Sequence, residues 1–259
     1  MDLGIAGRTA MICASSRGLG RGCAAALAQA GCELVINGRD LTVLDATARE
    51  FHDMFGVKVT AVAADISTAE GQKALLAACP TPDILVTNGG GPPPCDFREL
   101  TREAIVEGVI LNMIAPIELV QRVIDPMVER GFGRIVNITS LAVYQPFPGL
   151  DLSSGARAAL TAFLAGVGRS VAHRNVTINN LLPYKFATDR IRTTTAFAAR
   201  AAGLSFEEQA TVQCGEIPAR RFGSPDEFGK VCAFLCSAHA GYVTGQNLRL
   251  DGGFHQSAF

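Results

Sequence analysis

Short apolar runs alternate along the chain with longer segments whose apolar residues recur at helical spacing. The apolar runs lie at residues 8–13, 32–37, 58–64, 83–88, 133–140, 176–182 and 247–250. The helical segments lie at residues 18–30, 40–55, 68–79, 101–130, 152–173 and 225–237. Strands that are apolar on both sides are typical of a parallel sheet covered by helices on both faces. The pattern therefore predicts an α/β fold with a doubly wound, parallel, seven-stranded sheet.

No linker or internal repeat interrupts this alternation, and we predict a single domain over residues 1–259. Residues 184–222 lack a strand-like run and carry three consecutive threonines at 193–195. A connection of that length in a compact domain is usually a lid or a binding loop. We expect this excursion to lie over the edge of the sheet, beside a substrate.

Two of the predicted helical stretches, 104–124 and 156–168, are apolar almost all round. A helix that covers one face of a sheet normally keeps a polar stripe toward solvent. We therefore expect the outer faces of these helices, around Leu160, Phe163 and Leu164, to be covered by another copy of the chain. A homotetramer or homodimer is the predicted assembly.

Charge and composition narrow the class of partner. The formal net charge is −1, and no basic cluster is longer than Arg220-Arg221, so nucleic acid and anionic membranes are not expected as partners. The chain has no apolar run of membrane-spanning length and no signal-peptide pattern, which predicts a cytoplasmic protein. Eight cysteines without a C-x-x-C motif predict reduced thiols and no metal site. Cys232 and Cys236, four residues apart on a helix, are interpreted as small buried residues, and the alternative is a pair of metal ligands.

A glycine-containing loop separates the first predicted strand from the first predicted helix. Residues 13–20 read CASSRGLG. Gly18 and Gly20 allow a tight turn and a close approach of the backbone to a ligand, and the helix that follows offers free N–H groups to a pyrophosphate. This context predicts a Rossmann-type dinucleotide site, and the alternative is a tight turn without a ligand. The candidate cofactor-binding residues of the loop are Ala14, Ser15, Ser16, Arg17, Gly18, Leu19 and Gly20.

The end of the second strand indicates which dinucleotide would bind. It reads Asn37-Gly38-Arg39-Asp40. Asp40 is interpreted as the N-cap of the next helix. Arg39, with Arg17 from the first loop, suits the dianionic 2′-phosphate of NADP, so NADP is predicted in preference to NAD.

Further candidates follow the other strands. Because the carboxyl ends of parallel strands meet at one edge of the sheet, these residues are expected to lie together there. Gly89 to Gly91 would let the strand end pass flat against a ring, and the alternative is a flexible turn before the prolines at 92–94. The cofactor-binding candidates of this edge are Asn37, Arg39, Asp65, Ile66, Asn88, Gly89, Gly90, Arg157, Pro183 and Thr188.

Over essentially its whole length the chain resembles the classical short-chain dehydrogenase/reductase family, in particular members similar to 3-oxoacyl-carrier-protein reductases. Residues 13–20 are similar to the family motif Thr-Gly-x-x-x-Gly-x-Gly, with Cys13 for threonine and Ala14 for the first glycine. Residues 88–91 resemble Asn-Asn-Ala-Gly, and residues 217–227 and 244–253 also match family patterns. The resemblance implies catalytic roles for Asn112 and Ser140.

The resemblance also shows where this chain departs from the family. A catalytic Tyr is expected thirteen residues after the serine and a Lys four residues later, and counting from Ser140 reaches Ser153 and Arg157. A serine hydroxyl is a far weaker acid than a phenol, whose pKa is ~10. Ser153 is therefore expected to orient a carbonyl, and Arg157 to hold the nicotinamide ribose. The alternative is a vestigial site whose helix still packs.

Tyr184 stands where the family has a glycine after Pro183. It is expected to act either as a displaced proton donor or as an aromatic wall against cofactor or substrate. If the chain is extended here, Lys185 is expected to point away from Tyr184, because neighbouring side chains of an extended segment diverge.

Together these residues imply an NADP(H)-dependent oxidoreductase that interconverts a carbonyl and an alcohol in a small molecule. The competing hypothesis is a non-redox protein of the same fold, either an isomerase or lyase or a nucleotide-binding subunit without catalysis. The residues predicted to bind a dinucleotide favour the first hypothesis, and the absent Tyr and Lys favour the second.

Overall fold

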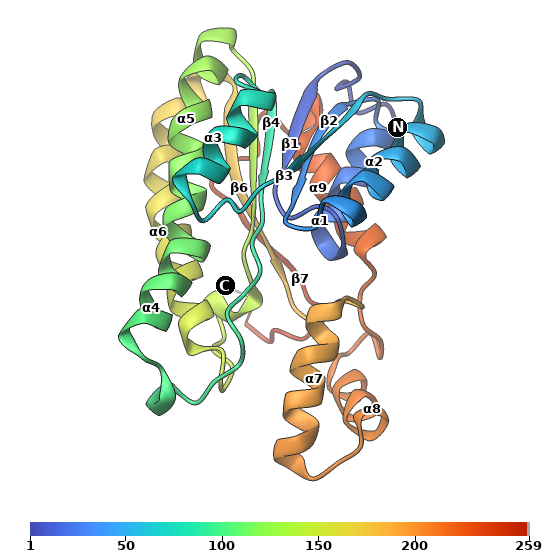
Figure 1. Cartoon of the computed structure of the whole chain (residues 1–259), viewed down its shortest axis with the longest axis vertical. Helices are drawn as coiled ribbons and strands as arrows, with labels where there is room; N and C mark the ends of the chain where they lie inside the picture. The colour runs from blue at the N-terminus through green and yellow to red at the C-terminus, as the bar shows by residue number, and fades with distance from the viewer. Residues whose placement is uncertain (258–259) are drawn as a thin grey trace.

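The structure, a computed structural model that describes residues 1–257, contains one parallel sheet with the strand order β3-β2-β1-β4-β5-β6-β7 (Figure 1). The strands are β1 Thr9–Ile12, β2 Glu33–Gly38, β3 Val59–Ala63, β4 Ile84–Thr87, β5 Gly133–Ile138, β6 Val176–Pro183 and β7 Asn247–Leu250. All seven predicted strands are confirmed. The chain has a single-domain, Rossmann-like α/β fold, whose strand order reverses between β1 and β4.

The helices cover both faces of the sheet. They are α1 Gly18–Gln29, α2 Leu41–Phe55, α3 Ala69–Ala78, α4 Arg102–Val109, α5 Ala115–Arg130, α6 Asp151–Val171, α7 Asp189–Ala202, α8 Phe206–Glu216 and α9 Pro225–Cys236. The helices α1, α2 and α9 lie on one side of the sheet, and α3, α5 and α6 lie on the other (Figure 1). Buried side chains of the first three form one cluster with the sheet, and those of the other three form a second. This arrangement explains why the strands are apolar on both sides.

Local sequence fixes several helix starts. Asp40 accepts hydrogen bonds from the backbone N–H groups of Thr42 and Val43, which confirms it as the N-cap of α2. Ser205 and Ser224 begin α8 and α9 with capping boxes. α1 and α9 cross closely at Gly22 and Gly229, where a Cβ on either residue would overlap the opposite backbone.

The predicted helix over residues 101–130 is divided. α4 and α5 are joined by one π-helical turn, Ile110–Ile114, which contains Asn112. Residues 184–222, expected as an excursion without strands, form α7 and α8, which project beyond the carboxyl edge of the sheet (Figure 1). Figure 1 shows this helical pair standing clear of the two layers that cover the sheet.

The expectation of an exposed apolar surface around Leu160 and Leu164 is wrong for those two residues. Each is 2% exposed, because both side chains pack against the sheet within the second cluster. Of the three residues named, only Phe163 faces outward, at 47% exposed. The helix thus has a buried and an exposed side, and its apolar composition reflects a wide contact with the sheet.

A row of polar side chains crosses the buried sheet in register. The Thr87 hydroxyl donates to Asn137 at 2.7 Å, Asn137 donates to Asn180 at 3.0 Å, and Asn180 donates to Asn247 at 2.7 Å. Asn247 then donates to the hydroxyl of Tyr144 at 3.2 Å. Because each buried amide has partners, the row links β4 to β7 without leaving unpaired polar groups.

Cys232 and Cys236 are fully buried, as expected. Among residues 1–257, no helix is long and apolar enough to cross a bilayer.

Candidate active site

The loop after β1 adopts the strained conformation that a phosphate-binding turn requires. Ala14 has φ +46° and Gly18 has φ +61°. The left-handed region costs a non-glycine residue about 1 kcal/mol, so Ala14 carries strain where the family motif has glycine. A Cβ on Gly20 would overlap the carbonyl oxygen of Ala14, and that oxygen accepts a hydrogen bond from Asn88 Nδ2 at 3.2 Å. The loop is thereby held against the end of β4.

The N-terminus of α1 is open to a ligand. Arg17 stands at its N-cap position but forms no capping hydrogen bond, and no acidic residue lies in the first turn. Among the described residues 1–257, no side chain accepts a hydrogen bond from the first N–H groups of α1, and the helix dipole adds positive potential there. An anion such as a diphosphate suits this position.

Two predicted cofactor residues are turned into the protein. Ser15 is fully buried and donates to the carbonyl of Ile12 at 2.8 Å. Asn37 is 2% exposed and donates to the carbonyls of Val62 and Ala64 at 3.1 and 3.0 Å. Their side chains thus fasten the ends of β1, β2 and β3 together, and cofactor contact at these positions would have to come from the backbone.

The two predicted cations lie on the surface near that loop. Arg17 and Arg39 are exposed. Arg17 lies 3.8 Å from the carboxylate of Asp189 at the start of α7. Hydrogen bonds from Ser67 keep the pKa of the Asp65 carboxyl below its ordinary value, burial opposes this, and the charge of Arg39 adds to the lowering.

The remaining nucleotide-end candidates line the same edge. Ser16 is half-buried against Gly38, Leu19 packs on the first apolar cluster, and Ile66 is buried. Gly90 has open space around the position of a Cβ, and Gly89 lies against Leu111. Thr188 stands beside Gly18, just after Pro183 and the end of β6.

Ser153 and Arg157, both on α6, lie beside the carboxyl ends of β4 and β5. Both are buried, with exposed fractions of 7% and 8%. The Arg157 guanidinium donates from Nε to Ser153 Oγ at 3.2 Å, from Nη1 to the carbonyl of Ile138 at 2.7 Å, and from Nη2 to the carbonyl of Gly89 at 3.2 Å. One side chain on α6 therefore ties together the ends of β5 and β4.

This engagement limits the role first expected for Arg157. Burial, and then the charge of Arg190, lower its pKa to about 10, so the group stays protonated at neutral pH. Three of its five N–H donors are already directed at protein oxygens. Contact between Arg157 and the nicotinamide ribose stays a prediction. In the structure, Arg157 also joins the ends of β4 and β5 by hydrogen bonds.

Ser140 comes shortly after Ile138, whose carbonyl Arg157 binds, and Asn112 lies on the π-helical turn between α4 and α5. Ser140 Oγ accepts a hydrogen bond from the backbone N–H of Ala142 at 3.1 Å, which leaves its own proton free to donate. Asn112 is 2% exposed and donates to the carbonyl of Gly108 at 3.1 Å. Within residues 1–257 its buried Oδ1 has no hydrogen-bond partner. Single π turns such as the one that carries Asn112 are frequent at functional sites.

Tyr184 belongs to an aromatic stack. Its ring centroid lies 4.0 Å from that of Phe254 and 5.4 Å from that of Phe147. Burial, with Glu216 adding, raises the pKa of Tyr184 above its usual value, which makes the phenol a weaker acid. This favours the aromatic wall over the displaced proton donor.

The chain bends at Lys185 after the end of β6, so the extended conformation on which the expected divergence from Tyr184 depended is not present. Lys185 Nζ lies 4.9 Å from the Tyr184 ring centroid and pairs with Glu216 at 3.3 Å.

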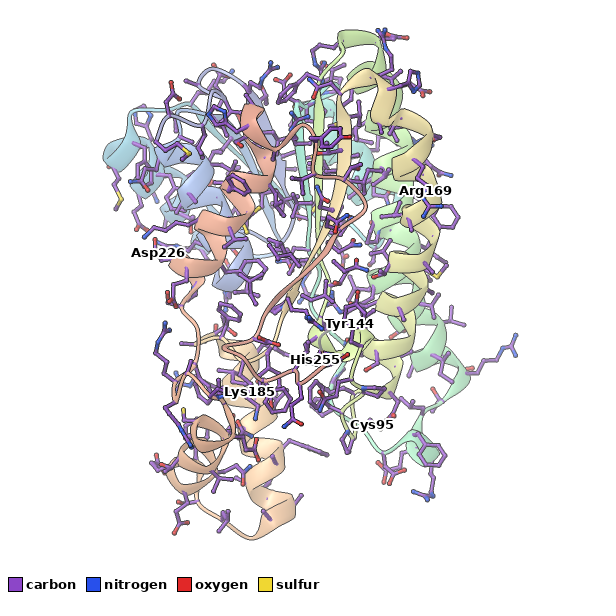
Figure 2. The ribbon with its side chains drawn as sticks, turned by 180° about the vertical axis from the view of Figure 1, so that it is seen from behind. Cys95, Tyr144, Arg169, Lys185, Asp226 and His255 are labelled. Atoms are coloured by element: carbon purple, nitrogen blue, oxygen red, sulfur yellow. The ribbon has the colours of Figure 1, made fainter. Side chains whose placement is uncertain are left out.

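The C-terminal segment reaches the same end of the molecule. In Figure 2, Tyr144 and His255 lie next to each other at this end of the molecule. The rings of Tyr144 and His255 are 5.9 Å apart. Sequence reasoning missed the C-terminal Phe254, because its contact with Tyr184 joins segments that are distant along the chain.

Arg190, on α7, was also missed. It donates to the carbonyls of Gly91 and Pro92 at 3.4 and 2.9 Å, beside Ser153. No motif marked it, and only the fold of residues 184–222 brings it there.

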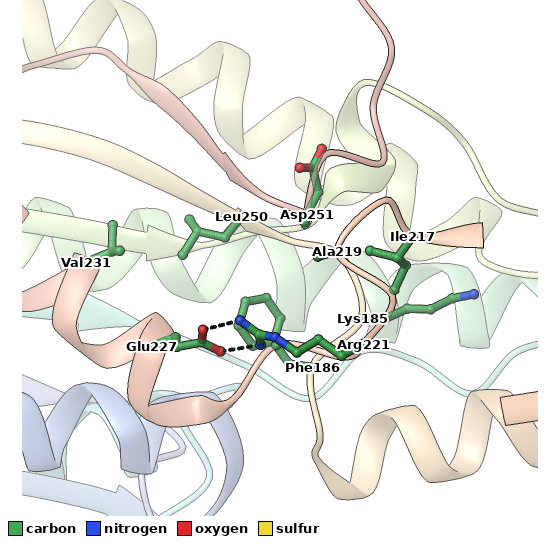
Figure 3. Close-up of a pocket in the computed structure, with 11 residues that line it drawn as sticks. Lys185, Phe186, Ile217, Ala219, Arg221, Glu227, Val231, Leu250 and Asp251 are labelled. Atoms are coloured by element: carbon green, nitrogen blue, oxygen red, sulfur yellow. Dashed lines mark hydrogen bonds and ion pairs between the residues drawn. The ribbon is translucent and has the colours of Figure 1, made fainter. Parts of the chain in front are cut away.

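A cavity with an open volume of about 200 Å³ lies apart from Ser153 (Figure 3). It is lined by Lys185, Phe186, Ile217, Ala219, Arg221, Gly223, Glu227, Val231, Leu250, Asp251 and Gly252. Arg221 and Glu227 pair at 2.6 Å, and Figure 3 shows the Lys185 amine turned away from that pair. The cavity contains none of the predicted site residues.

A protein-family model described as "Enoyl-(Acyl carrier protein) reductase" matches residues 13–255. A solved structure described as a short chain dehydrogenase/reductase family protein covers 98% of the chain and 99% of its own length, with 28% identity and a TM-score of 0.83. The chain belongs to the short-chain dehydrogenase/reductase family. Within this family it is 30% identical, over 257 residues, to a 3-oxoacyl-[acyl-carrier-protein] reductase of Aquifex aeolicus, covering 98% of this chain and 99% of that protein.

Two further relatives of the family bear on the site. An NADPH-dependent reductase of Bacillus subtilis is 29% identical over 257 residues, covering 96% of this chain and 98% of its own. The structure of L-sorbose reductase from Gluconobacter frateurii, complexed with NADPH and L-sorbose, matches with a TM-score of 0.92 and 29% identity. That match covers 99% of this chain and 100% of the other.

Proposed function

We propose that this short-chain dehydrogenase/reductase is an NADP(H)-dependent oxidoreductase that interconverts a carbonyl and an alcohol, with Ser153 and Arg157 where the family has Tyr and Lys. The observation that carries the proposal is the open N-terminus of α1 beneath the strained loop 14–18. Relatives described as NADPH-dependent, or solved with NADPH, support the choice of dinucleotide.

The residues present fit the cofactor. The uncapped N–H groups of α1 suit its diphosphate, and the absence of a Cβ at Gly20 allows the close packing of the loop against Ala14. The exposed Arg17 and Arg39 would hold the 2′-phosphate. The open space at Gly90 would admit the nicotinamide end. When bound, the cofactor supplies or accepts a hydride.

The chain's own hydroxyl groups would orient the carbonyl. Ser140 Oγ and Ser153 Oγ each accept a hydrogen bond within the protein, from Ala142 N–H and from Arg157 Nε, and each keeps its own proton to donate. A substrate carbonyl oxygen between them would receive two hydrogen bonds. As that oxygen becomes an alkoxide it takes a proton that comes ultimately from solvent, since Arg157 is held in hydrogen bonds to protein oxygens and burial makes Tyr184, by its raised pKa, a weaker donor than an ordinary phenol.

The experiment that tests this function is the oxidation of NADPH in the presence of a panel of ketones and oxo acids, followed by loss of its absorbance. Binding of NADPH together with reduction of a carbonyl is the expected result. Binding of NADPH with no hydride transfer to any compound would favour the non-redox alternative.

Arg39→Ala should weaken NADPH binding by roughly tenfold to a hundredfold and leave NADH binding almost unchanged. A hydrogen-bonded phosphate–guanidinium contact contributes about 1.5–3 kcal/mol, and only NADPH carries the 2′-phosphate. Fluorescence titration measures both dissociation constants. Arg49→Ala, which removes an exposed arginine from α2, is the matched control. Equal losses for the two cofactors would contradict the assignment to Arg39.

We also infer that the chain associates with copies of itself. Ile105 and Val106 on α4 and Phe163 on α6 remain 42%, 47% and 47% exposed. Light scattering at micromolar concentration should give the mass of a dimer or tetramer, and Phe163→Glu should shift the equilibrium toward smaller species. A monomeric wild-type protein would contradict the inference.

A further inference from the structure

Two guanidinium groups meet beside Ser153 without an acidic partner. Arg190 Nη2 lies 3.0 Å, and Ser153 Oγ 3.6 Å, from the point where a Cβ on Gly91 would stand. Arg157 Nε donates to the same Ser153 oxygen at 3.2 Å. Among residues 1–257, no carboxylate forms a salt bridge with Arg157 or Arg190.

This pairing of like charges is costly for the free protein. Arg157 is 8% exposed and Arg190 is half-buried, and burial lowers the pKa of each. Charges removed from water normally have an opposite charge close by, because desolvation otherwise costs several kcal/mol. An arrangement that leaves two cations uncompensated is typical of a site that awaits an anion.

Arg190 has donors to spare for that anion. It uses two N–H groups on the carbonyls of Gly91 and Pro92, at 3.4 and 2.9 Å, and its guanidinium carries five. The planar fork suits a carboxylate or phosphate, which can accept two parallel hydrogen bonds. A half-exposed Arg190 at the base of the projecting helix α7 can meet a ligand, whereas the buried Arg157 acts as a fixed charge behind it.

We propose that Arg190, backed by Arg157, binds a carboxylate of the substrate, so that the substrate is an oxo acid or hydroxy acid. The proposal rests on the function proposed above. A phosphate of the cofactor offers the same chemistry, but the residues suited to phosphates, Arg17 and the open end of α1, lie at the β1 loop, whereas Arg190 lies at the Ser153 end.

Apolar side chains stand beside Ser153. Pro92, Pro93, Leu150 and Leu152 surround a narrow hollow that has no open volume for a water molecule in this structure. An oxo acid with its carbonyl at Ser153 and its carboxylate at Arg190 would have these apolar neighbours, and a long carbon chain would have to move them apart.

The experiment compares charged and neutral forms of one ligand. Isothermal titration would measure the binding of 4-oxopentanoate, 2-oxobutanoate and their methyl esters to the protein saturated with NADP⁺, a complex that cannot reduce them. At least one acid should bind wild type roughly tenfold or more tightly than its ester, the value of one hydrogen-bonded charge pair. Arg190→Met should abolish this preference, and Arg190→Lys should retain part of it.

Arg192→Met, which removes an exposed arginine two residues along α7, is the matched control and should leave the preference intact. No preference for any acid in wild type would overturn the proposal. Equal weakening of acid and ester in Arg190→Met would also overturn it and leave Arg190 as a latch between α7 and residues 91–92. If Arg190→Met instead weakened NADP⁺ binding alone, the anion would be the cofactor's phosphate.

These readouts separate the two proposals. Because binding is measured without turnover, a protein that reduces no ketone would disprove the proposed function while the acid-to-ester ratio still decides the role of Arg190. If NADP⁺ failed to bind, the same titrations on the free protein would give that ratio. Circular dichroism confirms that each variant is folded.

Discussion

Replacing Ser153 by tyrosine and Arg157 by lysine in the same chain should raise kcat/KM for neutral ketones by about 10²-fold or more. A positioned proton donor contributes roughly 10²–10⁴ in rate. The phenol, with a pKa of ~10, would be made more acidic by the neighbouring ammonium, whereas the serine hydroxyl supplies almost no acidity. Methyl esters of oxo acids and simple ketones are the appropriate substrates, because they have no carboxylate for Arg190 to bind.

The matched control for this gain is Ser153→Phe with Arg157→Lys. It places the same ring in the hollow beside Pro92 and Leu152 without the hydroxyl, so its activity should stay at or below that of wild type. Both variants need a melting curve first, because the lysine makes fewer hydrogen bonds than Arg157 and the assay must run below the transition. Equal activity in the two variants would show that proton supply at position 153 does not limit the reaction.

Ser153→Ala alone separates orientation from proton transfer. If Ser153 only orients the carbonyl, its removal costs one hydrogen bond of about 1 kcal/mol, which is roughly a fivefold loss in kcat/KM. Loss of all turnover would instead mean that Ser153 carries the proton.

The fold was predictable because its signal is repeated. Each of the strands is a short apolar run, and each was found within a residue or two of its observed bounds. Burial on both faces of a parallel sheet leaves a pattern that needs no knowledge of distant contacts. The helical pair α7 and α8 was missed as structure because residues 184–222 were identified only by the absence of a strand, while the capping box at Ser205 went unused.

The site was predictable where a residue acts through its own loop. Gly18, Gly20 and the open end of α1 follow directly from the strand–loop–helix order. The buried roles of Ser15 and Asn37 were not predictable, because they depend on neighbouring strand ends that only the sheet order specifies. The exposure predicted for Leu160 and Leu164 failed for a related reason, since an apolar composition does not tell which side of a helix meets the sheet.

Arg190 shows most clearly which contacts could not be predicted from the sequence. Its guanidinium meets the carbonyls of Gly91 and Pro92 across about a hundred residues of sequence, and nothing near position 190 distinguishes it from Arg192. The Tyr184 stack with Phe254 has the same character. Such contacts come from the return of the chain to one edge of the sheet.

Arg157→Ala should lower the free energy of unfolding by about 2–4 kcal/mol, a much larger effect than that of an ordinary surface substitution. The variant leaves the carbonyls of Ile138 and Gly89 without the hydrogen bonds at 2.7 and 3.2 Å that they now accept. Each such loss costs about 1–3 kcal/mol in a buried position, and the missing side chain adds a cavity. Relief of a desolvated charge, and of its repulsion from Arg190, offsets part of that sum.

Urea denaturation of four proteins isolates the cause of this loss. Arg157→Met fills the space without donors, so the difference between it and Arg157→Ala measures the cavity and the remainder measures the hydrogen bonds. Arg169→Ala, on the exposed side of the same helix, should change stability by no more than ~0.5 kcal/mol. If Arg157→Ala kept wild-type stability and lost only NADPH affinity, the guanidinium would serve the ribose, as the sequence first implied. If stability and NADPH affinity fell together, the hydrogen bonds by which Arg157 joins β4, β5 and α6 would be needed to hold the cofactor-binding region in its folded conformation.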